Sequence, residues 1–339
     1  MSLRSSLAAV ADRAVGDGDA VDPATLNPQR AYATVVARVQ RLSPNYLRFT
    51  LEAEELRHFH TGGLDQRIKL LLPRADGTLP DLGLFDQPQP EMMQWYTTWR
   101  QLPEAERNPI RTYTVRAIRP WAQQIDVDFV VHGTEGPASA WAMRAEVGDE
   151  LVVIGPDGRS TRAGGGIEFD PHTARDVLLA GDETAVPAIC AILEMLPERV
   201  HGEAYLEIPT RADALDVANS SGVEIFWLPR EGAARGAPLT SAVQNWGRRR
   251  AEIFAQRRAS WQPARGEPVG APSGAEDLAE LGEDDLLWEV GDADGFREYA
   301  WLAGEAGVIT GLRRHLVKDV GLSRKQVSFM GYWKQGRAS

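Results

Sequence analysis

The sequence has almost no cysteine. Cys190 is the only one in 339 residues, so it has no partner for a disulfide within the chain. A single thiol also cannot hold a structural zinc ion or a cysteine-ligated iron–sulfur cluster within one chain. This scarcity fits a reducing compartment, and we expect the protein to be cytoplasmic.

Long apolar runs are missing as well. The longest near the N-terminus is LAAV at 7–10, which is too short for the apolar core of a secretion signal. No stretch approaches the roughly 18 consecutive apolar residues of a membrane span. We therefore expect neither export nor insertion into a membrane.

Positive charge is in deficit. Lys and Arg number 37 against 48 Asp and Glu, which gives a formal net charge of −11. Nucleic acid and anionic membrane surfaces repel such a chain. We expect no nucleic-acid partner. The six histidines form no convincing metal site, since His58 and His60 lie two apart with no carboxylate partner fixed by the sequence.

At about 150 residues per domain, the length suggests two domains. Residues 1–30 have little periodicity and are expected to form a flexible tail. Residues 31–170 hold short alternating segments separated by Pro and Gly, at 32–39, 46–51, 68–72, 111–118, 125–132 and 151–154. This pattern predicts an antiparallel β-barrel, with one helix at 91–101 in a proline-rich loop.

The remainder, 171–339, alternates strands and helices. Strands are expected at 176–180, 204–208, 223–228 and 299–303, with a helix after Thr184 and another at 307–318. Such alternation predicts an α/β domain with a parallel sheet. Residues 232–296 break the rhythm with a basic half and an acidic half, which we interpret as a solvated insertion or a partner surface.

Two segments of the first domain are suited to a dinucleotide. Arg111 and Tyr113 share one face of a predicted strand, where Arg can hold a phosphate and Tyr can stack on a ring, while Thr114 can bond a polar ring edge. The second segment is HGTEGPASAWA at 132–142. Its glycines and the N–H groups of Ala138 and Ser139 at a helix start favour an anion such as a pyrophosphate.

Two strand-to-helix corners stand out in the second domain, GDETA at 181–185 and AGEAG at 303–307. Ligands bind at such corners in open α/β sheets. The G-x-G-x-x-G fingerprint is missing, so a typical tight dinucleotide site is not indicated.

Together these motifs resemble the siderophore-interacting proteins, FAD-dependent ferric-siderophore reductases of the ferredoxin-reductase-like superfamily. The matching segments are DQRIKLLLP at 65–73, RTYTVR at 111–116, DFVVHG at 128–133, GPASAWA at 136–142, GDETA at 181–185, WLAGE at 301–305 and GYWKQG at 331–336. The resemblance covers roughly 31–339 except the insertion. It implies a flavin-binding split barrel followed by a Rossmann-like α/β domain that binds NADH or NADPH.

The resemblance also implies roles for individual residues. Arg111 would contact the FAD phosphates, and Tyr113 and Thr114 the isoalloxazine ring. The other expected contacts to FAD are Asp128, Val130, His132, Gly136, Pro137, Ala138, Ser139 and Trp141. The expected contacts to the nicotinamide cofactor are Gly181, Asp182, Glu183, Thr184, Ala185, Gly304 and Glu305, and the C-terminal aromatics Tyr332 and Trp333 would close over the flavin region.

For the substrate, Lys69 matches a position that lines the siderophore pocket in this family. A second family position, often basic, is Asp157 here, and Arg159 is expected to substitute. No metal ligand and no catalytic side chain is expected, because iron arrives chelated and the flavin performs the chemistry.

The sequence leaves alternatives open. A general flavin or ferredoxin-linked reductase and a non-enzymatic siderophore-binding flavoprotein both remain. The donor is NADH, NADPH or reduced ferredoxin, and Arg211 and Arg230, which follow predicted strands, could each read a 2′-phosphate. We expect a monomer.

Overall fold

The structure is a computed structural model that describes residues 22–79, 81–86, 92–131, 136–162, 165–260 and 288–336. The chain divides into two compact units. One comprises Met1–Ile167 with Cys190–Met195, and the other comprises Glu168–Ile189 with Leu196–Ser339. Of the expected tail at 1–30, residues 1–21 lie outside the described part.

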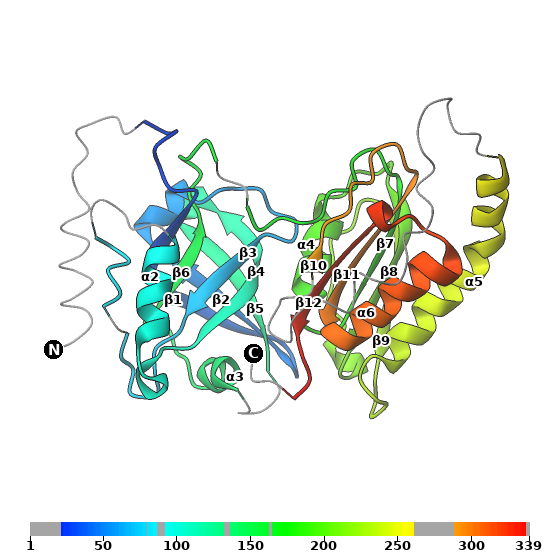
Figure 1. Cartoon of the computed structure of the whole chain (residues 1–339). Helices are drawn as coiled ribbons and strands as arrows, with labels where there is room; N and C mark the ends of the chain where they lie inside the picture. The colour runs from blue at the N-terminus through cyan, green and yellow to red at the C-terminus, as the bar shows by residue number, and fades with distance from the viewer. Residues whose placement is uncertain are drawn as a thin grey trace. The chain divides into compact units, whose positions relative to one another are not determined.

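The first unit contains a closed barrel in the order β1-β2-β5-β4-β3-β6 (Figure 1). Every neighbouring pair is antiparallel, which confirms the predicted architecture. The strands are β1 Gln29–Ser43, β2 Tyr46–Glu52, β3 Arg67–Leu71, β4 Ile110–Arg119, β5 Gln124–Val130 and β6 Glu150–Pro156. Strand β1 is longer than predicted because register shifts after Val36 and Arg41 interrupt its alternation.

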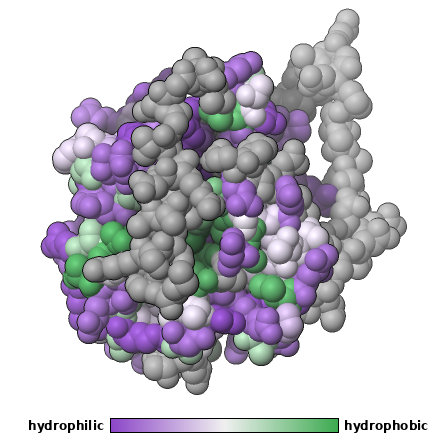
Figure 2. Space-filling view, turned by 90° about the vertical axis from the view of Figure 1, so that its left-hand side faces the viewer, coloured by the Kyte–Doolittle hydropathy of each residue, from purple (hydrophilic) through white to green (hydrophobic). Residues whose placement is uncertain are grey.

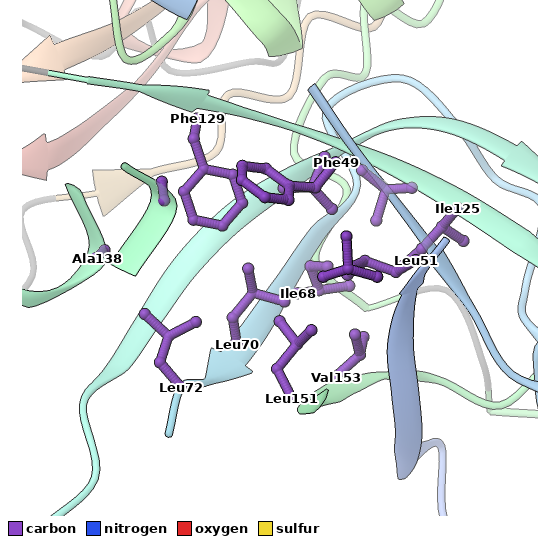
Figure 3. Close-up of a cluster of buried hydrophobic side chains, with 14 of the residues drawn as sticks. Phe49, Leu51, Ile68, Leu70, Leu72, Ile125, Phe129, Ala138, Leu151 and Val153 are labelled. Atoms are coloured by element: carbon purple, nitrogen blue, oxygen red, sulfur yellow. The ribbon is translucent and has the colours of Figure 1, made fainter. Parts of the chain in front are cut away.

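Apolar side chains that alternate along the strands fill the interior of the barrel. Ile125, Val127 and Phe129 of β5 are fully buried in one cluster, and Phe49 of β2 meets Phe129 edge-on at 4.9 Å (Figure 3). Such aromatic pairs stabilise a core beyond the area they bury. The inward-facing side chains of β4 and β5 therefore pack against a dense apolar core.

A second apolar cluster lies on the outside of the barrel. Helix α2, Met92–Gln101, confirms the predicted helix, and its Trp95 packs with Leu71, Val152 and Ile154 of β3 and β6. Short helical turns complete this unit, namely η1 Glu54–His58, η2 Glu104–Glu106, η3 Pro120–Ala122 and α3 Pro137–Ala142. The face drawn in Figure 2 is mainly hydrophilic with scattered apolar patches.

The second unit is built on a six-stranded sheet in the order β10-β12-β11-β7-β8-β9. All neighbours are parallel except β10 and β12, as the alternation of strands and helices predicts. The strands are β7 Asp176–Gly181, β8 His201–Ile208, β9 Gly222–Pro229, β10 Trp288–Glu289, β11 Glu298–Glu305 and β12 Val327–Trp333.

Helices cover both faces of this sheet. Figure 1 shows α4, Val186–Met195, on one face, and α5, Ala237–Ser260, with α6, Ala306–Arg314, on the other. Helix α6 continues as a π-helical turn, η5 His315–Val320, and short turns lie at η4 Arg211–Asp213 and η6 Arg324–Gln326. None of the helices in the described ranges has both the length and the apolar character that crossing a bilayer requires.

The structure differs from the expected insertion at 232–296. Leu239, Val243 and Trp246 of α5 are buried against the sheet, so the first part of this segment is a core helix. Its arginines mask this in the sequence, because Arg249 and Arg250 bind Glu203 of β8. Residues 261–287 lie outside the described part.

Candidate functional site

The face formed by β3 and β4 carries the first predicted residues. Tyr113 lies opposite Ile68, and Arg111 lies opposite Leu70, so both share one face, while Thr114 lies opposite Arg67 on the other. The Tyr113 ring is 4.2 Å from that of Phe129, and burial raises the pKa of its hydroxyl. Tyr113 is therefore a fixed, neutral ring at the edge of the barrel core.

Arg111 is a half-buried cation. Its guanidinium donates a 2.8 Å hydrogen bond to the carbonyl of Ile110, and in the described part of the chain it forms no ion pair. Burial lowers its pKa, which marks an environment short of negative charge. A half-buried guanidinium in such an environment is suited to bind an anion.

The start of α3 offers further donors. Gly136 is the N-cap of the helix, with a φ of 88°, a conformation that favours glycine, and it has no side chain to cap the helix. Pro137 occupies the first turn, and Ser139 follows. Ala138 and Trp141 are buried, and Trp141 packs on Phe49 at 5.0 Å, so its ring belongs to the core.

The expected flavin-lining residues of β5 have a different environment. Asp128 is nearly fully buried and accepts two hydrogen bonds from Arg48, at 2.7 and 2.8 Å. Val130 is half-buried and lies opposite Tyr46. His132 lies outside the described residues. The Asp128 carboxylate therefore forms an ion pair with Arg48, which links β5 to β2.

Lys69 lies on the outer face of β3, between Thr112 of β4 and Ile154 of β6. Burial, with a smaller effect of Arg67, lowers its pKa. Across the described ranges Lys69 forms no ion pair, so its charge is available to a ligand.

Arg159 is held differently from Lys69. It donates to the fully buried Asp157 through Nε at 3.0 Å and Nη2 at 2.7 Å. Burial alone would raise the pKa of Asp157, but the hydrogen bonds and charge of Arg159 hold it below its usual value. The acidic residue that departs from the family pattern is thus neutralised internally, and Arg159 is not a free cation.

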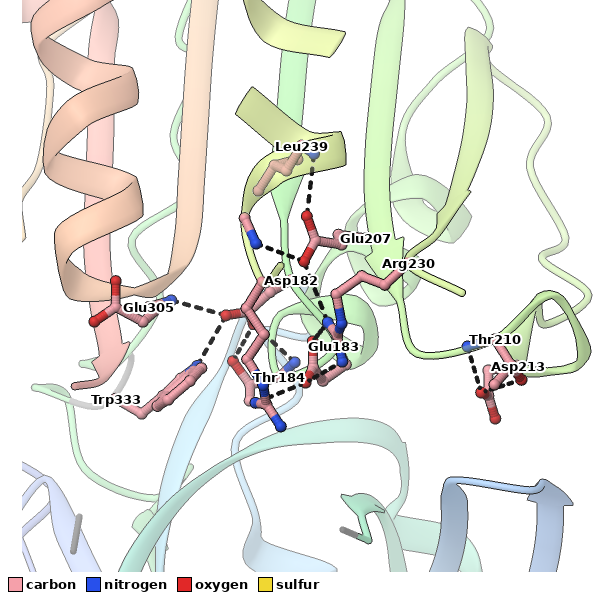
Figure 4. Close-up of polar contacts among 12 residues, drawn as sticks. Asp182, Glu183, Thr184, Glu207, Thr210, Asp213, Arg230, Leu239, Glu305 and Trp333 are labelled. Atoms are coloured by element: carbon pink, nitrogen blue, oxygen red, sulfur yellow. Dashed lines mark hydrogen bonds and ion pairs between the residues drawn. The ribbon is translucent and has the colours of Figure 1, made fainter. Parts of the chain in front are cut away.

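In the second unit, Asp182 joins three elements at the carboxyl ends of β7 and β11 (Figure 4). Its carboxylate accepts hydrogen bonds from Thr184 N at 2.9 Å, Glu305 N at 2.8 Å and the Trp333 indole at 2.8 Å. Burial, followed by the neighbouring Glu183 carboxylate, raises the pKa of Asp182 to about 6. The two predicted corners, 181–185 and 303–307, therefore meet at one carboxylate.

Gly304 shows how tightly this junction is packed. Its φ is 146°, and a Cβ atom there would lie 2.7 Å from the Asp182 carboxyl group. Glu305 follows as the N-cap of α6 and accepts from Val308 N at 2.9 Å.

A second carboxylate network lies beside Asp182. Arg230 binds Glu183 and, at 3.2 Å, Glu207, and Arg235 reaches Glu183 at 3.2 Å. Glu207 also accepts from Gly236 N at 2.8 Å and from Leu239 N at 3.0 Å, which caps the start of α5. Arg230 is therefore buried and occupied, whereas Arg211 is exposed.

Tyr332 and Trp333 are part of strand β12. Trp333 donates its indole N–H to Asp182, and Arg235 lies over its ring with Cζ 5.2 Å from the centroid. The Tyr332 ring meets Trp301 edge-on at 6.5 Å. Closure of these aromatics over the flavin stays a prediction.

A small cavity of only about 10 Å³ lies among these groups. It is lined by Asp182, Glu183, Glu207, Arg235, Gly236, Leu239, Glu305, Val308, Ile309 and Trp333. Sequence reasoning missed Glu207 and Arg235. The position of Arg235 before Gly236 and a helix start was the only local signal.

Two known protein families match the sequence of this chain. Residues 35–160 match the siderophore-interacting FAD-binding domain, and residues 174–336 match the siderophore-interacting protein family.

Individual proteins of known name or structure are similar to this chain. Ferric vibriobactin reductase ViuB of Vibrio cholerae is 28% identical over 313 residues, covering 91% of this chain and 92% of the relative. The NADPH-dependent ferric-chelate reductase of Escherichia coli is 30% identical over 216 residues, covering 63% and 77%. The crystal structure of the siderophore-interacting protein SipS from Aeromonas hydrophila is 25% identical, with a TM-score of 0.59 and coverage of 91% and 93%.

Proposed function

We propose that this chain, which belongs to the siderophore-interacting protein family, is an FAD-dependent reductase that passes electrons from NADH or NADPH to Fe(III) held in a siderophore. Relatives named as ferric vibriobactin reductase and ferric-chelate reductase support an oxidoreductase of this kind. We place the release of Fe(II) in the cytoplasm.

The observation that carries the proposal is the half-buried Arg111 cation, which forms no ion pair with any residue that the structure describes. It shares a face of β4 with the fixed Tyr113 ring, and the N-cap of α3 is Gly136, which has no side chain to cap the helix. A cation and the first turn of a helix fit a pyrophosphate, and a fixed aromatic ring fits the flavin. We assign Arg111 and Gly136–Ser139 to the phosphates of FAD, and Tyr113 and Thr114 to its ring.

When bound, FAD supplies the conversion of a two-electron hydride donor into single electrons for iron. The protein positions the reactants and shapes the local field. Asp128, held by Arg48, fixes β5 behind the Tyr113–Phe129 pair. Hard oxygen ligands hold Fe(III) better than Fe(II), so reduction loosens the iron from its siderophore without any protein ligand.

Lys69 is assigned to the ferric siderophore. Its charge is half-buried and not neutralised by a carboxylate in the described ranges, so an anionic complex gains more from it than from Arg159, which Asp157 already neutralises.

The donor is assigned to the edge where Gly181–Ala185, Gly304 and Glu305 meet. Arg230 has no capacity left for a 2′-phosphate because two carboxylates occupy it. Exposed Arg211 is the better candidate of the two, which favours NADPH over NADH.

Anaerobic stopped-flow spectroscopy tests the function. NADPH or NADH is expected to bleach the flavin absorbance, and a ferric siderophore is then expected to restore it as a chelator traps Fe(II). Reduction by ferredoxin alone would favour a ferredoxin-linked reductase. A flavin that no donor reduces would favour a siderophore-binding flavoprotein.

A further inference from the structure

Strand β9 is the outermost strand at one end of the second sheet. It pairs with β8 on one side, and no strand in the described part of the chain lies on its other side. Such an edge presents backbone N–H and C=O groups that can pair with another chain. The residues whose backbone groups point outward therefore decide whether this edge is open.

The hydrogen bonds at the two ends of β9 show which residues these are. The backbone N–H of Gly222 donates at 2.8 Å to the residue that precedes β8, and that of Arg230 donates at 2.9 Å to the last residue of β8. Even-numbered residues therefore point towards β8, and backbone direction alternates along a strand. The backbone groups of Val223, Ile225 and Trp227 thus point outward.

The chain itself closes both ends of this outward edge. The Asn219 side chain donates to the Val223 carbonyl at 2.8 Å, and the Val223 N–H donates to the Ser221 hydroxyl at 3.3 Å. At the other end stands Pro229, which has no N–H to offer and is tolerated at an edge for that reason. The edge is therefore open only in its middle.

The open middle of β9 consists of Ile225, Phe226 and Trp227. In the described part of the chain, no hydrogen bond reaches the outward backbone groups of Ile225 or Trp227. The Phe226 side chain is 37% exposed, although its ring stacks on that of Tyr205 with 5.2 Å between centroids. Backbone groups without partners thus lie beside an exposed aromatic ring.

We propose that β9 pairs with β9 of a second copy of this chain, antiparallel about a two-fold axis at Phe226. In this register Ile225 lies opposite Trp227 of the second copy, and the two residues exchange their N–H and C=O hydrogen bonds. Because the axis repeats this exchange, every outward group of both residues gains a partner. Such a dimer differs from the monomer that the sequence predicts.

Charge is compatible with this register. Glu224 is the only charged residue of β9, and it lies opposite Leu228 of the second copy, so no like charges face each other across the strands. The strand also lacks the lysine that often protects an exposed edge. The net charge of −11 on each chain opposes association, so salt should strengthen the pairing by screening this repulsion.

Analytical ultracentrifugation of the full chain tests whether the dimer forms. The wild type should change from the mass of one chain towards that of two as its concentration rises. Ile225→Pro removes an outward N–H but no bond to β8, as proline can do at an edge. This variant should remain a single chain and keep the unfolding midpoint of the wild type.

Cysteine cross-linking tests the register. At the axis, Phe226 lies about 4.5 Å from its counterpart between Cα atoms, which is within disulfide range, whereas residues two positions away lie about 13 Å from theirs. With diamide as oxidant, Phe226→Cys should form a covalent dimer, and Glu224→Cys and Leu228→Cys should not. An equal mixture of these two should cross-link, because the two positions face each other.

The wild type is the control for oxidation, because Cys190 is buried and should not cross-link. A wild type that stays a single chain up to millimolar concentration would overturn the proposal, as would a dimer that survives in Ile225→Pro. Cross-linking of Glu224→Cys alone as fast as Phe226→Cys would overturn the register. None of these readouts requires turnover, so a failure of the proposed reductase activity leaves them standing.

Discussion

Single side chains show how far burial changes chemistry in this protein. Cys190 is fully buried in α4, and burial raises the pKa of its thiol to about 12 from an ordinary value of 9.0. The thiolate is the reactive form, so both access and ionisation protect the only cysteine.

We expect Cys190 to be inert in the folded protein. A thiol reagent such as DTNB should release no colour from the native chain over an hour, and one equivalent once guanidinium chloride unfolds it. Rapid stoichiometric labelling of the native protein would show that α4 opens readily.

Arg111 is the residue on which cofactor retention depends. Arg111→Ala should weaken FAD binding by roughly 1.5–3 kcal/mol, or about 10- to 150-fold in affinity, because a charge-assisted contact is lost. FAD content after dialysis measures this. Arg38→Ala, an exposed arginine of β1 in the same barrel, is the control. Unchanged FAD content in Arg111→Ala would remove Arg111 from the site.

The sequence revealed some residues of the site and concealed others for a physical reason. Arg111, Tyr113 and Asp182 lie in local motifs, so their positions could be predicted. Glu207 and Arg235 act through partners that are distant in the sequence. Glu207 binds α5 and Arg230, and Arg235 binds Glu183 and lies over Trp333. No spacing along the chain announces such a contact.

At the scale of elements, a buried carboxylate fixes where α5 begins. Glu207 lies near the end of β8. Its carboxylate accepts hydrogen bonds from the backbone amides of Gly236 and Leu239 at the start of α5, and it also pairs with Arg230. A negative charge is favourable at this end of a helix, where backbone N–H groups have no partner.

Glu207→Ala should therefore destabilise the second unit by about 3 kcal/mol, because it orphans two amides and part of a buried arginine. Glu224→Ala on neighbouring β9 is exposed and should change stability by no more than about 0.5 kcal/mol. Urea denaturation compares the two. Similar losses in both variants would contradict the cap.

Elements with clear alternation could be predicted, and the others could not. Strand β5 alternates apolar and acidic residues from Ile125 to Phe129, and this pattern predicts its ends to within two residues. Helix α5 carries consecutive arginines at 248–250 that mask its apolar stripe, and Gly331 breaks the pattern of β12. In both cases tertiary packing supplies what local preference does not.

At the scale of the whole molecule, the distribution of lysine is unusual. The sequence holds four lysines, and Lys69 is the only one before residue 318. It therefore provides a local cation in a chain whose net charge of −11 repels anions.

If Lys69 attracts the ferric complex, Lys69→Glu should lower kcat/KM for an anionic ferric siderophore but spare flavin reduction by the nicotinamide donor. The screening length falls from about 30 Å at 0.01 M salt to about 10 Å at 0.1 M, so salt should slow the wild type and not the variant.

Lys325→Glu changes the net charge equally, lies on η6 of the second unit and serves as the control. Steady-state rates across an ionic-strength series measure all three proteins. Equal salt slopes for the wild type and Lys69→Glu would return Lys69 to the ordinary surface lysines.

The position of β12 has a consequence for biosynthesis. This strand pairs with β11 on one side and β10 on the other, although it comes after every other strand in the sequence. While the ribosome still holds residues 327–333, the edge of β11 that pairs with β12 has no partner strand. Asp182 then lacks its hydrogen bond from the indole of Trp333. The barrel strands have all emerged by then, so the nascent chain can finish its first unit long before its second.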